Sequence, residues 1–369
     1  MKFQAQNPKM FLKACQGKRL VLFGAGYAAA TFINNYLPES LHVDYICDND
    51  DRKVDTKLFG IDISKPERLK KENVDDIVVL ITAVNPNELY EQVRNMGDFY
   101  CFVSKTITDE IYNSRAVYFH NNKKELEWLK AKLEDEMSLR VIEKIVENFQ
   151  TGNSDFSEII TRDAYLINRL FDKEMCKDEV VIDAGAYNGD TVKKFSSYFG
   201  RALKKIYAIE PSIEMQEPLE RMIANLCLCN VEILPYALSD KDAVVEFNYI
   251  SNDAYKSFIQ GSTDIASKII HNAKKYQVVL KKLDDIIPVK EKITYIKMDI
   301  EGAEYSALLG ARRIIQKDKP KLAICLYHNA SDYTKIPRLI HDIEPGYVFY
   351  IRHHHKEHLE TVIYAKYRE

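Results

Sequence analysis

Short apolar runs that end in polar residues recur along the chain, and helical patterns lie between them. In the C-terminal half these runs cover residues 180–183, 205–210, 231–235, 293–298 and 321–327. Apolar runs of this length are typical of buried strands, and strands that alternate with helices form parallel sheets. The pattern therefore predicts an α/β fold whose site lies along the carboxyl ends of the strands.

The N-terminal part of the chain repeats this alternation as a separate unit. The apolar run Leu20–Phe23 precedes the sequence Gly24-Ala25-Gly26-Tyr27-Ala28-Ala29, and the next run, residues 43–47, ends at Asp48. This order of strand, glycine turn, helix, strand and acid is that of half a dinucleotide-binding unit. We predict a smaller Rossmann-like domain over residues 1–107. Whether it binds a nucleotide or nucleotide sugar, or serves as a packing scaffold, stays open.

An amphipathic stripe predicts a helix between the two sheets, over residues 123–149. Its apolar side chains recur every three to four residues and are Leu126, Leu129, Leu133, Met137, Val141, Ile145 and Phe149. We assign residues 108–178 to a helical linker or cap. The stripe either packs on a neighbouring core or forms the seam of a homodimer.

The most informative stretch is Asp183-Ala184-Gly185-Ala186-Tyr187-Asn188-Gly189-Asp190-Thr191. It differs from the G-x-G-x-x-G fingerprint, whose helix receives a pyrophosphate. Gly185 would let the backbone pass close to a ligand, because glycine has no Cβ. The acids Asp183 and Asp190 suit a ligand with a cationic or hydroxyl-rich face. S-adenosylmethionine has both, in its ammonium and sulfonium groups and its ribose.

Other predicted strands also end in polar residues. Glu210, followed by Pro211, stands where a doubly wound sheet places a ribose-binding carboxylate, although it could simply cap the next helix. Ser239 and Asp240 form a turn that could flank an adenine ring. Asp299 and Glu301 follow the run at 293–298.

In this order the motifs resemble those of the FkbM-type S-adenosylmethionine-dependent methyltransferases. The resemblance covers approximately residues 134–367 and extends to Leu308-Leu309-Gly310-Ala311 and Lys319-Pro320-Lys321-Leu322-Ala323-Ile324. It implies a class I methyltransferase domain, which we place at residues 179–369, with a seven-stranded, mostly parallel, doubly wound sheet whose last strand is antiparallel. It also implies methylation of a hydroxyl on a sugar or natural product, with Asp299 and Glu301 as acids that line the site.

The motifs and the resemblance together predict the residues that bind the cofactor. They are Asp183, Gly185, Tyr187, Gly189, Asp190, Thr191, Glu210, Pro211, Ser239, Asp240 and Asp299. Tyr165 is a further candidate contact, or a core residue.

An aliphatic hydroxyl is a poor nucleophile at neutral pH, so a general base is expected. His328 is the favoured candidate, because neutral imidazole accepts protons near pH 7. The alternatives are Asp299, Glu301 and His353, and His328 could instead cap the turn that follows it.

Histidines also cluster between the last two apolar runs, at residues 353–355 and 358. Arg352 and His353 could hold an acidic or hydroxylated acceptor there. We expect no metal, because adjacent histidines on a strand point to opposite faces. Mg²⁺ at Asp299, Glu301 or Glu304 receives similarly little weight.

The composition and charge of the chain argue against several classes of binding partner and location. The net charge of −3 gives no basic field for nucleic acid, and the stretch after Met298 lacks the [D/N]-P-P-aromatic loop of base-methylating enzymes. The seven cysteines lack C-x-x-C spacing, which favours reduced thiols. No apolar stretch is long enough to span a bilayer, and the first residues carry no export signal. We therefore expect a cytoplasmic protein.

The sequence thus predicts an S-adenosylmethionine-dependent O-methyltransferase that acts on a saccharide or similar small molecule. One alternative is an NAD(P)- or nucleotide-sugar-binding enzyme centred on the N-terminal domain. Another is a non-catalytic S-adenosylmethionine-binding assembly protein.

Overall fold

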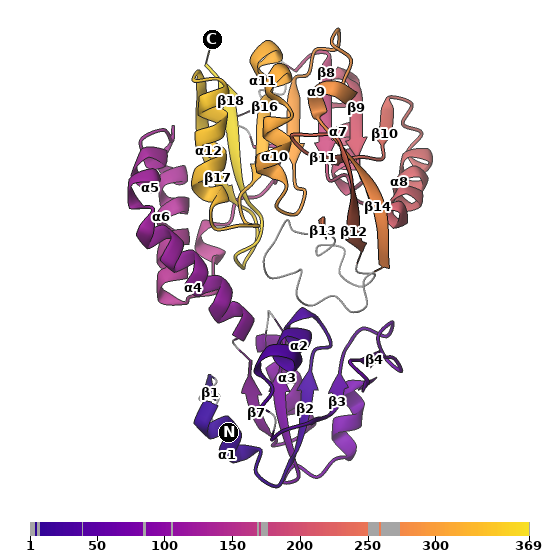
Figure 1. The fold of residues 1–369 in the computed structure, drawn as a ribbon, viewed down its shortest axis with the longest axis vertical. Helices are drawn as coiled ribbons and strands as arrows, with labels where there is room; N and C mark the ends of the chain where they lie inside the picture. Colours follow the sequence, from indigo (N-terminus) through magenta and orange to yellow (C-terminus); the bar gives the residue numbers. More distant parts are fainter. Residues whose placement is uncertain are drawn as a thin grey trace. The chain divides into compact units, whose positions relative to one another are not determined.

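The chain divides into two compact units, Met1–Asn113 and Ser114–Glu369, each built around its own seven-stranded sheet (Figure 1). The computed structural model describes the chain apart from residues 1–3, 6–7, 39, 84–85, 105, 168–169, 171–175, 250–257, 260–273 and 369. The boundary falls within helix α4 (Thr106–Asn121). The helical segment predicted as a separate linker over residues 108–178 therefore lies mostly in the C-terminal unit.

The N-terminal unit has the predicted Rossmann-like alternation. Its strands are β1 (Gln4–Ala5), β2 (Arg19–Phe23), β3 (Val43–Cys47), β4 (Lys57–Leu58), β5 (Ile61–Ser64), β6 (Ile77–Ile81) and β7 (Tyr100–Val103), and its helices are α1 (Pro8–Ala14), α2 (Tyr27–Thr31) and α3 (Pro86–Met96). The sheet order is β1-β7-β6-β2-β3-β5-β4, and of these pairs only β4 and β5 run antiparallel. Along β2, Leu20 and Leu22 join one core cluster while Val21 and Phe23 join another, because successive strand side chains point to opposite faces. The helix expected at residues 28–36 is α2 followed by a π-helical turn over Phe32–Tyr36.

The C-terminal unit has the predicted class I arrangement. Its main strands are β8 (Glu179–Ala184), β9 (Leu203–Ile209), β10 (Val231–Leu234), β15 (Tyr295–Met298), β16 (Lys321–Cys325), β17 (Tyr347–His353) and β18 (Thr361–Tyr367). They lie in the order β10-β9-β8-β15-β16-β18-β17. The last strand, β18, is antiparallel to both of its neighbours. This confirms the fold class.

Helices cover this sheet and follow its strands. They are α5 (Lys123–Lys130), α6 (Glu136–Thr151), α7 (Asp190–Phe199), α8 (Ile213–Asn225), α9 (Leu283–Ile286), α10 (Glu304–Leu309), α11 (Arg312–Asp318) and α12 (Asp332–Ile343). Figure 1 shows α8 at the β10 edge of the sheet and α5 and α6 at the opposite end. All six residues of the central strand β8 are buried, as expected for a parallel strand covered on both faces.

Two helical segments are each divided in two. The segment after β15 divides into α10 and α11 at Gly310, where a Cβ would lie 2.1 Å from the backbone oxygen of Ser239. The helix expected over residues 123–149 becomes α5 and α6, because Asp135 caps α6 by accepting a hydrogen bond from the Ser138 amide. Apolar periodicity continues across both breaks, so it gave no sign of either one.

A small second sheet was not predicted. It consists of β11 (Ala237–Leu238), β12 (Ala243–Tyr249), β13 (Phe258–Ile259) and β14 (Lys274–Lys281), in the order β11-β14-β12-β13. Phe247 and Leu280 belong to its own apolar cluster. The sheet stands between β10 and β15 in the sequence, and its first strands follow the β10 turn directly.

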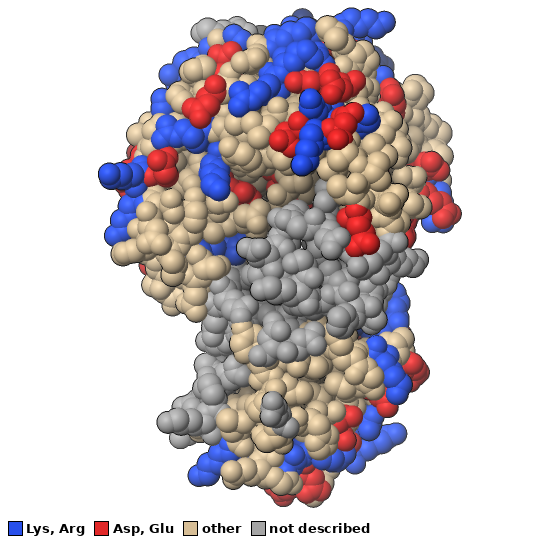
Figure 2. Space-filling model, viewed as in Figure 1, with Lys and Arg blue, Asp and Glu red and all other residues tan. Residues whose placement is uncertain are grey.

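The surface charges and the state of the cysteines can be compared with what the composition predicted. Figure 2 shows basic and acidic side chains side by side on the visible face. All seven cysteines are free thiols, and Cys227 and Cys229 are the two exposed ones. Across the described residues, helices are too short or too polar to cross a membrane.

Helix α6 is attached to β17 through a buried ion pair. Arg352 lies 2.5 Å from the carboxylate of Asp135, and Arg352 also donates to the Ser138 hydroxyl, which accepts the Ile351 amide as well. Arg352 therefore binds helix α6, and its role in holding the acceptor stays a prediction. The residue is buried.

We predict that Asp135→Ala lowers the free energy of unfolding by about 2–4 kcal/mol, because it removes a helix cap and leaves the buried Arg352 without its acid. Chemical denaturation measures the change. Glu134→Ala is the matched control: Glu134 pairs with the exposed Arg368, and a surface pair contributes about 0–1 kcal/mol. Equal losses from the two substitutions would contradict the structural role of Asp135.

Candidate functional site

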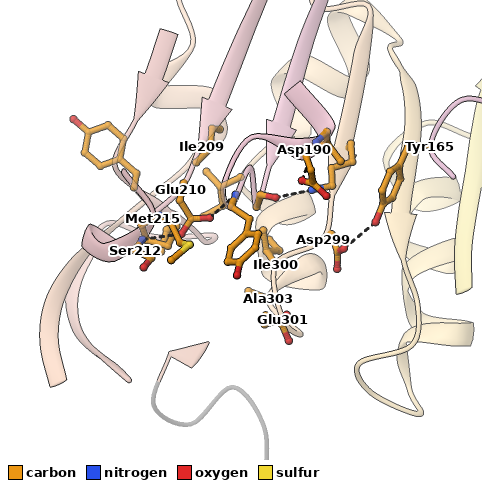
Figure 3. A pocket seen from close by; sticks show the side chains of 18 of the residues that line it. Tyr165, Asp190, Ile209, Glu210, Ser212, Met215, Asp299, Ile300, Glu301 and Ala303 are labelled. Carbon is orange, nitrogen blue, oxygen red and sulfur yellow. Dashed lines mark hydrogen bonds between the residues drawn. The ribbon is translucent and has the colours of Figure 1, made fainter. Parts of the chain in front are cut away.

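A cavity of about 310 Å³ opens at the carboxyl ends of β8, β9 and β15. The turns after these strands border it, and Tyr236, Leu238 and Phe247 border it from the small second sheet. Figure 3 shows Glu210 and Met215 toward one side of the cavity and Asp299 with Tyr165 toward the other. The site therefore lies at the sheet edge that the sequence predicted.

The turn after β8 is held tightly against the end of β15. Gly185 has a φ of +78°, and a Cβ there would lie 1.9 Å from the backbone oxygen of Asp299. The amides of Gly185 and Ala186 both donate to the carbonyl of Ile209, at 3.0 and 3.1 Å. Glycine is required here by its positive φ and by the close approach of two strand ends.

Glu210 fixes the backbone on both sides of the cavity wall, and its binding of the ribose stays a prediction. Its carboxylate accepts hydrogen bonds from the Tyr187 amide at 2.9 Å and the Ser212 amide at 2.8 Å. Burial raises the pKa of Glu210, and these two amides partly oppose the rise. Glu210 thus shapes the turns beside it, and it also borders the cavity.

Asp183 lies beneath the cavity and holds a buried lysine. The Lys297 ammonium lies 3.1 Å from the Asp183 carboxylate and donates to the Gly185 carbonyl at 2.7 Å. Burial would lower the pKa of Lys297, but Asp183 and Asp299 raise it above its ordinary value. The hydroxyl of Thr191 donates to the same Asp183 carboxylate.

Lys297 borders the cavity, and sequence reasoning gave it no role. The available signal was a lysine inside an otherwise apolar strand, which needs an acidic partner when it is buried.

Some of the predicted site residues border the cavity and others do not. Those that border it are Gly185, Tyr187, Asp190, Thr191, Glu210, Pro211, Asp299 and Glu301. The described lining does not include Asp183, Gly189, Ser239, Asp240, His328 or His353.

Gly189 and Ser239 have packing contacts instead. At Gly189 a Cβ would meet the side chain of Met222 on α8 at 2.1 Å. Ser239 is buried against Gly310, and its hydroxyl donates to Asp240.

Asp299 is held by two tyrosines. Tyr165 donates to one carboxylate oxygen at 2.8 Å, and Tyr327 donates to the other at 2.9 Å. Burial would raise the pKa of Asp299, but the nearby Lys297 and His328 and the two hydroxyls lower it below its ordinary value. Asp299 is therefore an ionised acid that borders the cavity.

His328 is surrounded by acids. Its Nδ1 lies 3.0 Å from Glu304, and its Nε2 lies 3.6 Å from Asp299 and 3.5 Å from Glu301. Burial would lower the pKa of His328, but these three carboxylates raise it to about 10. Burial raises the pKa of Glu301 to about 8, against the effect of His328.

This raised pKa does not favour a neutral His328, and its role in accepting the hydroxyl proton stays a prediction. A histidine with this pKa carries its proton at neutral pH unless another cation takes the place of that proton.

His353 is also outside the site. Its Nδ1 lies 2.8 Å from the Thr361 hydroxyl, and its ring packs at 5.0 Å from that of Phe156. Burial lowers the pKa of His353 to about 4. The side chain is fully buried, and a catalytic or acceptor-binding role of His353 stays a prediction.

In the N-terminal unit, the acid of the glycine turn is used within the protein. The Asp48 carboxylate accepts the Ala25 amide at 2.6 Å and the Asp50 amide at 2.8 Å, and it pairs with Lys53. These contacts fix the turn after β2. Nucleotide binding by this unit stays a prediction.

Comparisons with known proteins identify the domain that carries the cavity. Residues 183–360 match the family model for the methyltransferase FkbM domain. The chain is similar to a crystal structure of methyltransferase FkbM from Methylobacillus flagellatus KT, with 22% identity and a TM-score of 0.68 over 98% of this chain and 94% of that chain.

The chain also matches an rRNA methylase from Streptococcus thermophilus, with 14% identity and a TM-score of 0.33 over 53% of this chain and 92% of that one. The comparison with curated proteins found no match. At 22% identity, the structure from Methylobacillus flagellatus KT bears on the fold alone. The resemblance seen in the sequence is confirmed by the family match.

We predict that Gly185→Ala destabilises the protein more than Gly152→Ala does, by about 1–3 kcal/mol, because the added methyl group overpacks the end of β15. Gly152 is the matched control, since it has a φ of +71° but open space around its missing Cβ. Denaturation of both variants isolates the steric effect from the backbone strain that they share. Equal stability of the two variants would show that the turn after β8 relaxes freely.

Proposed function

Because residues 183–360 form a methyltransferase FkbM domain with S-adenosylmethionine as its cofactor, we propose that this protein methylates a hydroxyl group of a saccharide or similar small molecule. The observation that carries the proposal is one cavity bordered by both kinds of group that the reaction needs. The Gly185 turn and Glu210 suit the cofactor, while Asp299, Glu301 and Tyr165 suit a hydroxyl-bearing acceptor.

The residues present fit the cofactor. Glu210 is a buried acid at the end of β9, and its oxygens keep lone pairs for ribose hydroxyls. Ile209, Met215 and Leu238 add apolar surface suited to an adenine ring. When bound, S-adenosylmethionine supplies a methyl group that the acceptor oxygen takes as the carbon–sulfur bond breaks, with the bonding electrons leaving on sulfur.

The polar lining around Asp299 favours an acceptor rich in hydroxyls and without negative charge. Asp190, Glu301 and Glu360 border the cavity with Asp299. Carboxylates accept hydrogen bonds from hydroxyls and repel anions. The two lysines of the lining are already engaged, Lys194 with the Ala164 carbonyl and Lys297 with Asp183. Neutral or amino sugars therefore suit the cavity better than acidic ones.

Glu301 is the acid best placed to accept the hydroxyl proton once it is ionised, and its pKa of about 8 makes the carboxylate the main form only above that pH. It borders the cavity, and its carboxylate is 3.5 Å from His328, beyond a short hydrogen bond. Asp299, in contrast, is fixed by Tyr165 and Tyr327. Glu301 also has a positive φ of 55°, a strained backbone conformation for a residue other than glycine.

Turnover with a panel of acceptors tests the proposed function. The full chain is incubated with S-adenosylmethionine and neutral, amino and acidic sugars or their nucleotide derivatives. Formation of S-adenosylhomocysteine and a methyl ether, identified by mass spectrometry, supports the proposal. A product methylated on nitrogen or carbon would overturn it, as would S-adenosylmethionine binding without turnover on any hydroxyl acceptor.

We predict that Glu210→Ala weakens S-adenosylmethionine binding by about 1.5–3 kcal/mol, the free energy typical of a hydrogen bond to a charged group. Isothermal titration calorimetry measures the change. Glu220→Ala, which alters an exposed acid on α8, serves as the control and should bind like the unchanged protein. Unchanged affinity in a folded Glu210→Ala variant would remove the assignment.

We further predict that Glu301→Gln lowers turnover by about 10²–10⁴-fold, because the amide cannot take the hydroxyl proton. Cofactor affinity should stay nearly unchanged. Glu220→Gln, at an exposed acid on α8, should leave both quantities close to those of the unchanged protein. Turnover of Glu301→Gln within a few-fold of normal would assign the proton to another group.

A further inference from the structure

Three metal-binding side chains converge beside the acceptor end of the cavity. The ligand atoms of Asp299, Glu304 and His328 all lie within 4.8 Å of one another. Asp299 and His328 follow β15 and β16, which are adjacent parallel strands, and Glu304 is the first residue of α10. The grouping therefore follows from the sheet, because the carboxyl ends of neighbouring strands meet at one edge.

Two of these side chains are buried with unused ligand atoms. Glu304 is fully buried, and its Oε1 accepts the Ile300 amide at 2.8 Å. Its Oε2 has no hydrogen-bond partner among the described residues. The His328 side chain is 7% exposed, and its Nε2 is farther than 3.2 Å from both nearby acids. Buried polar atoms of this kind normally have partners.

Acidic side chains outnumber the basic ones around the cluster, where His328 and the nearby Lys297 are the bases that act on Asp299. Asp299, Glu301 and Glu304 surround His328, and the buried Asp332 lies on the helix that follows. One imidazolium balances one carboxylate. Burial raises the pKa of Asp332 to about 7, with Glu304 adding to the rise. A divalent cation would balance two carboxylates at once.

We propose that Asp299, Glu304 and His328 bind a divalent transition-metal ion beside the acceptor. Two carboxylates and one imidazole form a mixed oxygen and nitrogen donor set, which suits Mn²⁺ or Zn²⁺ better than Ca²⁺. Bound metal displaces the proton from the coordinating ring nitrogen of His328. We expected no metal from the sequence, and the convergence of these donors is the reason to revise that expectation.

The surrounding contacts match those of a supported metal site. The hydroxyls of Tyr165 and Tyr327 orient the Asp299 carboxylate, and the Ile300 amide orients Glu304. Such outer contacts fix the geometry of ligands. Resting on the proposed function, the role of the ion is to bind the acceptor oxygen and lower the pKa of its hydroxyl, so that Glu301 takes the proton more readily.

Metal binding without substrate provides the test. The full chain is freed of metal with a chelator and titrated with Mn²⁺, with calorimetry for affinity and electron paramagnetic resonance for the bound ion. We expect one ion per chain, and we expect His328→Gln and Glu304→Gln to weaken binding by about 10–100-fold or more. His341→Gln is the control, because His341, on α12, packs against Trp128 of α5 and lies outside the cluster. S-adenosylhomocysteine binding verifies that each variant is folded.

The outcomes separate this proposal from the proposed function. Absence of saturable Mn²⁺ and Zn²⁺ binding, or equal binding by the unchanged protein and both folded variants, overturns the metal site. If methyl transfer to a hydroxyl persists in that case, the proposed function stands. Site-dependent metal binding without transfer to any hydroxyl acceptor supports the site and overturns the function.

Discussion

The buried ion pair between Asp183 and Lys297 joins the two central strands of the C-terminal sheet at their carboxyl ends. Lys297 belongs to β15, and its ammonium reaches the Asp183 carboxylate and the carbonyls of Ala184 and Gly185 on β8. Both side chains are almost fully buried, so removal of either partner would leave an uncompensated charge. The tight turn at Gly185, and with it the floor of the cavity, depends on this pair.

The acidic side chains near that pair fall into an inner and an outer group. The inner acid, Asp183, is satisfied by Lys297 and Thr191. The outer acids, Glu210, Asp299 and Glu301, border the cavity. This order separates the residues that hold the strands together from the residues available to ligands. It also explains why an acid at the end of a strand can be essential to a site without contacting the cofactor.

The sequence predicted the sheet, because strands that are buried on both faces consist of unbroken apolar runs. The polar residues that follow these runs predicted the edge on which the cavity lies. It also predicted Glu210 and the Gly185 turn, whose roles are local. It did not predict the small second sheet, whose strands include β11 of only two residues. The separation of α10 from α11 was missed because it depends on the contact of Gly310 with Ser239.

Two predicted site residues have surroundings that their place in the sequence did not indicate. His328 and His353 were assigned from their position at strand ends, but their chemistry depends on neighbours that are distant in sequence. Glu304 and Glu301 raise the pKa of one histidine, while burial lowers that of the other. Lys297 was overlooked for the same reason, since its partner is on another strand. Periodicity locates a side chain on an element but does not show the charges around it.

A crystal structure of the full chain with S-adenosylhomocysteine would test the central claim most directly. The account predicts that the ligand occupies the cavity, with its ribose hydroxyls hydrogen-bonded to Glu210 and its sulfur on the side of Asp299 and Glu301. Ligand bound elsewhere in the chain, or ribose hydroxyls without contact to Glu210, would contradict it.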